Sequence, residues 1–342
     1  MYYITIDCGT TNSRVYVVDE KGTVLAKATK KVGVRNTSMT GSNACLREGL
    51  HETIREAIRL SGLETKQIRA IFSSGMITSE IGLYELPHMD APCGIAKLAQ
   101  NLMPVPIHLT DDPIPVFFVR GLKNPIPKEV PDPFAYVGNA DFMRGEETQM
   151  IGLMAREEFP LPGTAVMLSS CSKFMPINRN GEILGSLTST SGQLREAILA
   201  QTFVGKSVER QPGDEPAPEN YFDPSIVTAA ADWIQKGGLV RGLMFPRFLD
   251  VLLDTKWYAR KLFFEALIAA EDLLCIDQLH QFDSDCLGRF LFIGVPERCR
   301  LYEFLTKRAF PEAQVQSMTD LAEIDQLSIV GILKIAAEAG VL

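Results

Sequence analysis

The sequence has no long uncharged apolar run, no paired cysteine motif and no excess of basic residues. A membrane helix needs roughly 20 consecutive apolar residues, and because no stretch approaches this length we expect no membrane partner. The seven cysteines are odd in number and form no Cys-x-x-Cys pair, which favours reduced thiols over disulfides or a zinc site. The net charge of −8 gives no general support to nucleic-acid binding.

Two further absences narrow the class of protein. The four histidines lie far apart, so the sequence shows no metal-binding cluster. The first residues follow a strand pattern and lack a basic segment followed by an apolar one, so we expect a cytoplasmic location.

The 342 residues favour two domains over one. The 46% hydrophobic and 22% charged content is typical of an ordinary soluble globular protein.

The first part of the chain predicts three successive strands, then a helix and another strand. Apolar, β-rich runs at residues 2–6 and 14–18 flank a polar turn, and residues 23–32 continue as a third strand. Apolar residues at helical spacing predict a helix over residues 46–63, and residues 68–75 predict a buried strand. This β-β-β-α-β order differs from the strict β-α alternation of a Rossmann fold.

A second segment repeats this pattern after the proline-dense residues 104–133, which we expect to form short edge strands and a crossover. Asn180-Gly181 predicts a hairpin turn within it, and Ser191 is the expected N-cap of its helix. The predicted elements are strands at residues 164–170, 172–178 and 182–189 and a helix at residues 191–203. The matching order predicts an internal duplication of architecture without obvious residue identity.

The rest of the chain is predicted to be mainly helical after a polar, proline-rich loop at residues 207–224. The expected elements are helices at 224–236, 239–254, 256–275, 295–310 and 320–339 and strands at 289–294 and 313–318.

The stretch "DCGTTNSR" lies in the first predicted hairpin turn. Gly9 allows the backbone to approach a ligand closely. The amides and hydroxyls of Thr10, Thr11 and Asn12 suit an anion. Asp7 lies where it can hold Mg²⁺ directly or through water. A simple hairpin with turn-forming polar residues is the alternative, and this stretch alone leaves both open.

The stretch "LSSCSKF" occupies the equivalent hairpin of the second half. Ser169, Ser170 and Ser172 supply hydroxyl groups there, and Lys173 supplies a positive charge. A serine-rich turn is the alternative. Two hydroxyl-rich hairpins at matching places in a duplicated fold favour a phosphate-binding pair more than either hairpin does alone.

The third stretch, "ADFMRGEETQMIG", places charged residues where a helix is expected to begin. If the helix starts near Gly145, Glu146 and Glu147 lie in its first turn, where the helix dipole favours acids. The two side chains then point about 100° apart. A structural helix N-terminus is one interpretation, and a general base beside a substrate-binding arginine, Arg144, is the other.

Together these stretches resemble the sugar kinase, Hsp70 and actin superfamily, and within it the 2-dehydro-3-deoxygalactonokinase family. "MRGEETQ" is the most specific part of the likeness. The stretches that carry it are "IDCGTTNSRVYVVDEKG", "SSGMITSEIGLYELPHMDAPCG", "DFMRGEETQMIG" and "KFMPINRNGEI", with weaker likeness in "LMFPRFLDVLL" and "FLFIGVPERCRLYEFLTKR". The resemblance implies an α/β fold of two RNase H-like, actin-like ATPase lobes with ATP in an interlobe cleft. We expect an N-terminal lobe of residues 1–140 and a C-terminal lobe of residues 141–342, with the last helix packed back on the first lobe.

The resemblance also implies ATP- and Mg²⁺-dependent phosphorylation of the C6 hydroxyl of a 2-keto-3-deoxy sugar acid, with 2-dehydro-3-deoxygalactonate as the first candidate. It assigns Asp7 to the metal, Thr10 and Thr11 to the phosphate loop, and Arg14 to the substrate side. By position we favour Glu146 as the base, with Asp141 second. An acid substrate needs a cation, for which Arg144 is the candidate. Gly294 resembles the place where the second lobe of this superfamily meets adenosine.

One departure from the family pattern affects the second hairpin. The family reads Gly-Thr-His-Ser-Lys-Trp there, whereas this chain reads Ser169-Ser170-Cys171-Ser172-Lys173-Phe174. A weakened or non-catalytic sugar-acid-binding protein is therefore an alternative to a kinase, and another superfamily reaction, such as phosphoanhydride hydrolysis, is a third. A homodimer is one alternative for its assembly.

Overall fold

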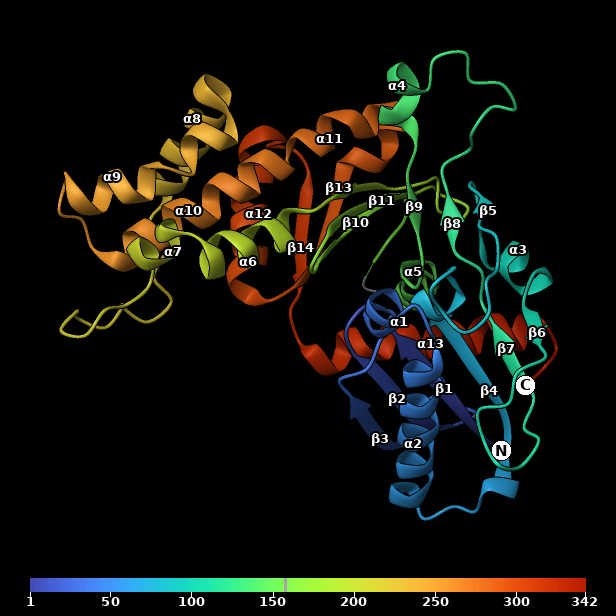
Figure 1. Cartoon of the computed structure of the whole chain (residues 1–342). Helices are drawn as coiled ribbons and strands as arrows, with labels where there is room; N and C mark the ends of the chain where they lie inside the picture. Colours follow the sequence, from blue (N-terminus) through green and yellow to red (C-terminus); the bar gives the residue numbers. More distant parts are fainter. Residues whose placement is uncertain (157–158) are drawn as a thin grey trace. The chain divides into compact units, whose positions relative to one another are not determined.

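The computed structural model describes residues 1–156 and 159–342, which form two compact units (Figure 1). Unit 1 comprises Met1–Leu161, Ile177–Ser186 and Ala322–Leu342, and unit 2 comprises Pro162–Pro176 and Leu187–Leu321. The expected boundary at residue 140 therefore lies inside unit 1, to which the final helix also belongs from Ala322 onward.

Unit 1 contains a six-stranded sheet in the order β3-β2-β1-β4-β7-β6. Its β1 strand is antiparallel to β2 and parallel to β4, which in turn is parallel to β7. Most side chains of β1 and β4 are buried, as expected for central strands with parallel neighbours. The strands are β1 (Tyr2–Cys8), β2 (Ser13–Asp19), β3 (Val24–Lys30), β4 (Ile68–Gly75), β6 (Met103–Val105) and β7 (Val116–Phe118).

The helix predicted from apolar spacing is α2 (Ala44–Ser61). It buries Leu46, Leu50 and Ile54 in the core of unit 1, and Gly62 ends it in the left-handed conformation. A small sheet consists of β5 (Met89–Asp90), β8 (Leu122–Lys123) and β9 (Phe142–Met143). The other α-helices are α1 (Val34–Thr40), α3 (Ile95–Gln100), α4 (Pro133–Tyr136), α5 (Glu146–Met154) and most of α13 (Leu321–Glu338).

Unit 2 repeats the strand order of unit 1. Its sheet has the order β12-β11-β10-β13-β14, which corresponds to β3-β2-β1-β4-β7. The pairs β10–β13 and β13–β14 are parallel, like β1–β4 and β4–β7. The strands are β10 (Gly163–Leu168), β11 (Ser172–Ile177), β12 (Leu187–Ser189), β13 (Arg289–Gly294) and β14 (Gln314–Met318). The predicted α/β fold with two lobes of the same architecture is confirmed.

The helices of unit 2 pack around α10, whose buried side chains share a core with Phe290 and Phe292 of β13. They are α6 (Ser191–Gln201), α7 (Phe203–Val208), α8 (Pro224–Gly242), α9 (Phe245–Val251), α10 (Trp257–Asp272), α11 (Leu274–Gln278) and α12 (Pro296–Ala309). Among the described residues, none of the helices is both long and apolar enough to cross a membrane.

Two local predictions are wrong. The strand expected at residues 182–189 is reduced to β12, because Gly185 has a φ of +154° and Ile183 forms only isolated bridges. The N-cap of α6 is Thr190, not Ser191. Ser191 is the first helical residue, and its hydroxyl contacts another serine instead of capping the helix.

Candidate active site

Residues 9–12 form the loop between β1 and β2 in unit 1. The amide of Gly9 donates to the carbonyl of Asn12 at 3.0 Å, which closes the turn. Within residues 1–156 and 159–342, no hydrogen bond engages the amides of Thr10, Thr11 or Asn12. Consecutive unpaired amides in a tight loop make an anion-binding concavity. The loop therefore has the backbone chemistry of a phosphate site.

The first amides of helix α1 bond to carbonyl oxygens of this loop. The amides of Val34 and Arg35 donate to the carbonyls of Gly9 and Thr10 at 3.3 and 2.9 Å. Gly33 makes this approach possible, because a Cβ there would lie 2.5 Å from the Thr10 oxygen. The carbonyls are thus engaged on the α1 side, and the amides are left for a ligand.

The loop between β10 and β11 in unit 2 is built in the same way. The amide of Gln193 in α6 donates to the carbonyl of Ser170 at 2.8 Å. A Cβ at Gly192 would lie 2.2 Å from the Ser169 oxygen, so this helix also closes on the loop only with glycine. Residues 169–171 make this loop one residue shorter than its counterpart in unit 1.

The first residue after each loop is a buried serine whose hydroxyl contacts the segment before α1 in unit 1 and the first residue of α6 in unit 2. In unit 1, Ser13 Oγ donates to the carbonyl of Val32 at 2.8 Å. In unit 2, Ser172 Oγ lies 2.8 Å from Ser191 Oγ. Ser13 and Ser172 are both fully buried. The hydroxyl of Ser172, which the sequence suggested for the cofactor, is therefore buried and bonded to other side chains of unit 2.

Lys173 is buried as well. It is 6% exposed, and its Nζ donates to Thr188 Oγ1 at 2.9 Å. Ser169 and Ser170, in contrast, are exposed. Of the four residues predicted here, these two serines present their side chains at the surface of the loop.

The same loop is contacted by a charged network that the sequence did not reveal. Arg298 donates from Nη1 to the carbonyl of Ser169 at 2.7 Å and from Nη2 to Ser172 Oγ at 3.1 Å. The hydroxyl of Tyr302 donates to the buried carboxylate of Asp272 at 2.5 Å. Burial is the main cause that raises the pKa of Tyr302 above its ordinary value. Single charged residues in helices far along the chain carry no sequence signal of this role.

Asp7 is the last residue but one of β1 and pairs with Arg14 across the hairpin. Asp7 Oδ2 lies 2.9 Å from Arg14 Nη1, and the two side chains are 33% and 40% exposed. Burial raises the pKa of Asp7, and the Arg14 charge opposes this change. Asp7 Oδ1 accepts no hydrogen bond from the described part of the chain.

These features fit a magnesium ion with few protein ligands. Mg²⁺ usually keeps several waters and binds one or two carboxylates together with substrate phosphates. Asp7 offers one carboxylate oxygen, Oδ1, that accepts no hydrogen bond from the described residues. The described residues hold no group of three or more His, Cys, Asp or Glu side chains that suits a metal. Any ion at Asp7 would therefore take its other ligands from water and phosphate.

Strand β4 connects Asp7 with the start of α5. Asp7 is opposite Ser74 in the parallel register of β1 and β4. Ser74 Oγ lies 3.0 Å from Thr148 Oγ1 of α5. A Cβ on Gly145 would lie 3.2 Å from Gly75 Cα, so the helix start packs directly on the strand end. The Asp7 loop and the "MRGEETQ" segment are thus neighbours within unit 1.

The guanidinium of Arg144 is held by the protein itself. Nη1 donates to the carbonyl and hydroxyl of Thr78 at 2.8 and 2.7 Å, and Nη2 donates to the carbonyl of Leu86 at 3.0 Å. Burial lowers the pKa of Arg144 below its ordinary value. Nη2 also lies 3.5 Å from His88 Nδ1, so both terminal nitrogens, which would bind a carboxylate end-on, are already engaged.

Glu146 and Glu147 begin α5, as predicted, and bond to different amides. Glu146 Oε2 accepts from the amide of Arg144 at 3.1 Å and is half-buried. Both carboxyl oxygens of Glu147 lie 2.9 Å from the amide of Gly145. Glu147 is fully buried, and this burial, reinforced by the charge of Glu146, raises its pKa to about 8. Of the two acids, Glu146 is the one that solvent reaches.

Asp141, the second candidate base, lies just before β9. Its Oδ1 accepts from the amide of Phe142 at 2.6 Å and from Ser186 Oγ at 3.0 Å. The bond from Ser186 connects it to the segment Ile177–Ser186 of unit 1.

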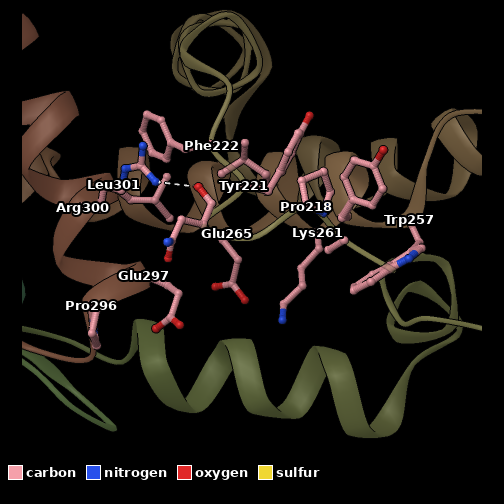
Figure 2. Close-up of a pocket in the computed structure, with 14 residues that line it drawn as sticks. Pro218, Tyr221, Phe222, Trp257, Lys261, Glu265, Pro296, Glu297, Arg300 and Leu301 are labelled. Atoms are coloured by element: carbon pink, nitrogen blue, oxygen red, sulfur yellow. Dashed lines mark hydrogen bonds between the residues drawn. The ribbon is translucent and has the colours of Figure 1, made fainter. Parts of the chain in front are cut away.

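Unit 2 also contains a cavity of about 340 Å³ between α10, the start of α12 and the loop before α8 (Figure 2). Aromatic side chains form one part of its lining. In Figure 2, Lys261, Glu265 and Glu297 extend toward the same side of the cavity. Two residues of its lining, Pro296 and Glu297, come shortly after β13 in the chain. The last residue of β13, Gly294, packs so closely on β10 that a Cβ would lie 2.9 Å from the carbonyl of Leu168. The aromatic lining residues are Tyr221, Phe222, Trp257 and Tyr258.

Comparison with known proteins gives a consistent result. Residues 7–335 match the family described as 2-keto-3-deoxy-galactonokinase. The chain is 25% identical over 213 residues to "Probable 2-dehydro-3-deoxygalactonokinase DgoK1" of Rhizobium meliloti (strain 1021), a match that spans 60% of this chain and 59% of that relative. A crystal structure from Sinorhizobium meliloti, provisionally assigned as a 2-dehydro-3-deoxygalactonokinase, aligns over 98% of both chains with a TM-score of 0.71 and 18% identity, which shows the same fold. The chain belongs to the 2-keto-3-deoxy-galactonokinase family.

Proposed function

We propose that this protein is an ATP-dependent kinase that phosphorylates the C6 hydroxyl of a 2-keto-3-deoxy sugar acid, with 2-dehydro-3-deoxygalactonate as the first substrate to test. The observation that carries the proposal is the family match over residues 7–335, which runs through both hairpin loops and the "MRGEETQ" segment. The names of the relatives agree with it.

The nucleotide is proposed to bind unit 2 along the first turn of α12. Pro296 and Glu297 of this turn line the cavity, and Arg298 bonds to the loop at Ser169. Flat aromatic rings with a few polar groups suit a nucleoside. In this proposal the base and ribose occupy the cavity, and the phosphates extend to Ser169 and Ser170.

Unit 1 is proposed to bind phosphate oxygens with the amides and hydroxyls of Thr10, Thr11 and Asn12. Asp7 would hold Mg²⁺ through Oδ1 or through water, while Arg14 keeps Oδ2 in place. When bound, the metal neutralises charge that develops on the transferring phosphoryl group.

The acceptor hydroxyl is proposed to lose its proton to Glu146, with Asp141 as the second candidate. Arg144 supports this role by donating its amide to Glu146 Oε2. Because the guanidinium of Arg144 is engaged elsewhere, Arg14 is the better candidate for the substrate carboxylate. Most of the rate enhancement would come from positioning and charge stabilisation.

The test is ADP formation by the full chain with Mg²⁺, ATP and a panel of 2-keto-3-deoxy sugar acids. NMR of the product should locate the new phosphoryl group on C6. Glu146→Gln and Asp141→Asn, assayed in parallel, identify the base by which of them loses turnover. If ATP neither binds nor is consumed with any acid of the panel, the proposal is wrong.

A further inference from the structure

The loop at residues 169–171 of unit 2 is contacted by a positively charged side chain, Arg298, that was not among the residues predicted from the sequence. Arg298 is the third residue of α12 and follows two residues that line the cavity. Its two terminal nitrogens donate to Ser169 and Ser172, at the start and just beyond the end of the loop. Lys173, the lysine predicted for this role, is buried and bonded to Thr188.

Tyr302, on the next turn of α12, helps to fix the position of Arg298. The Cζ atom of Arg298 lies 5.9 Å from the ring centroid of Tyr302, a cation–π contact. Tyr302 is itself anchored to Asp272, which also accepts a hydrogen bond from Ser189. Because Asp272 is almost fully buried, the hydrogen-bonded pair of Tyr302 and Asp272 keeps the guanidinium of Arg298 at the loop.

Arg298 retains unused hydrogen-bonding capacity. A guanidinium has five N–H donors, and the bonds to Ser169 and Ser172 use two of them. No other hydrogen bond of Arg298 occurs within the described residues. Its side chain is half-buried, and the adjacent Ser169 and Ser170 are exposed. A fixed guanidinium with free donors beside an exposed loop suits a phosphate oxygen.

We propose that Arg298 is a phosphate-binding residue of the nucleotide site and that it also holds the Ser169 carbonyl in place. The inference rests on the proposed function and deepens it. It identifies the positive charge of a loop that lacks the glycine, threonine and histidine of the family pattern. In this arrangement the cation comes from α12 rather than from the loop itself.

The experiment compares three variants with the unmodified chain: Arg298→Gln, Arg298→Lys, and Arg308→Gln as a matched control. Arg308 lies at the other end of α12, where it pairs with Asp232 at 2.7 Å. Calorimetric titration with adenosine, ADP and a non-hydrolysable ATP analogue separates nucleoside binding from phosphate binding. Thermal melting of each variant checks that it is folded.

Arg298→Gln should weaken binding of ADP and of the ATP analogue about tenfold to a hundredfold, as expected for the loss of a hydrogen bond to a charged group. Its affinity for adenosine should stay within about twofold. The affinity of Arg298→Lys for ADP and for the ATP analogue should lie between those of Arg298→Gln and the unmodified chain, because lysine keeps the charge but not the planar fork. Arg308→Gln should bind all three ligands like the unmodified chain.

The outcomes separate this inference from the proposed function. If Arg298→Gln and Arg298→Lys bind ADP and the ATP analogue normally, only the role of Arg298 is wrong. An equal loss of adenosine affinity would show a purely structural role and would also overturn it. If the unmodified chain binds no nucleotide, the proposed function fails and this inference fails with it. Should Arg298→Gln not fold, Arg298→Lys provides the same comparison.

Discussion

Replacing the buried Glu147 with glutamine should change how the stability of unit 1 depends on pH. The carboxyl has no exposed surface, and its pKa is raised to about 8 from an ordinary value of 4.5. An acid with a higher pKa in the folded chain binds its proton more tightly there. Its contribution to stability is therefore complete below about pH 4.5 and is lost as the pH rises through 8.

The size of the effect follows from linkage. With a pKa of 4.5 in the unfolded chain and about 8 in the folded chain, the free energy of unfolding should fall by about 3 kcal/mol between pH 5 and pH 8. Glutamine has the same shape and can accept from the Gly145 amide, but it does not ionise. The stability of Glu147→Gln relative to the unmodified chain should therefore rise by about 3 kcal/mol over this range.

The measurement is urea denaturation of both proteins at pH 5, 6, 7 and 8. Both tryptophans, Trp233 and Trp257, lie in unit 2, so unit 1 must be followed by hydrogen exchange of α5. Glu48→Gln, at an exposed position of α2 in the same unit, serves as the control for the loss of a surface carboxyl. A constant difference for Glu147→Gln across the four pH values would refute the reasoning.

Three further predictions concern the loops and their supports. Gly33→Ala should destabilise unit 1 by about 1–3 kcal/mol and lower ATP affinity, because its Cβ would collide with a loop carbonyl; Gly138→Ala, in open space, should do neither in melting and titration experiments. Tyr302→Phe removes a hydrogen bond to the buried Asp272 and should cost about 1–3 kcal/mol of unfolding free energy in urea denaturation; an unchanged midpoint would contradict this. Asp7→Asn should lower turnover more than about a hundredfold while adenosine binding persists; normal turnover would remove Asp7 from the metal site.

Local sequence patterns were sufficient to predict most of the fold. The apolar spacing of Leu46, Leu50 and Ile54 predicts α2, and Gly62 predicts its end. The repeated strand order was visible because each strand carries its own β-rich run. The strand over residues 182–189 failed because nothing in its composition shows that Gly185 adopts a positive φ.

The candidate site could be predicted only in its residue types. The polar loops were recognised, but the burial of Ser172 and Lys173 depends on strands and helices that pack over them. The partners of Arg144 are Thr78 and Leu86, more than fifty residues away, and no local pattern announces such contacts. Arg298 was missed for the same reason.

The way in which two helices grip the two loops has a consequence for protein engineering. Gly33 and Gly192 lie outside the loops that they close, and their contacts are with loop carbonyls, which every residue possesses. The loop side chains are therefore free to diverge, as the differing Thr-Thr-Asn and Ser-Ser-Cys sequences illustrate. A library that randomises residues 10–12 or 169–171 should retain the backbone of each loop, provided that the downstream glycine is kept.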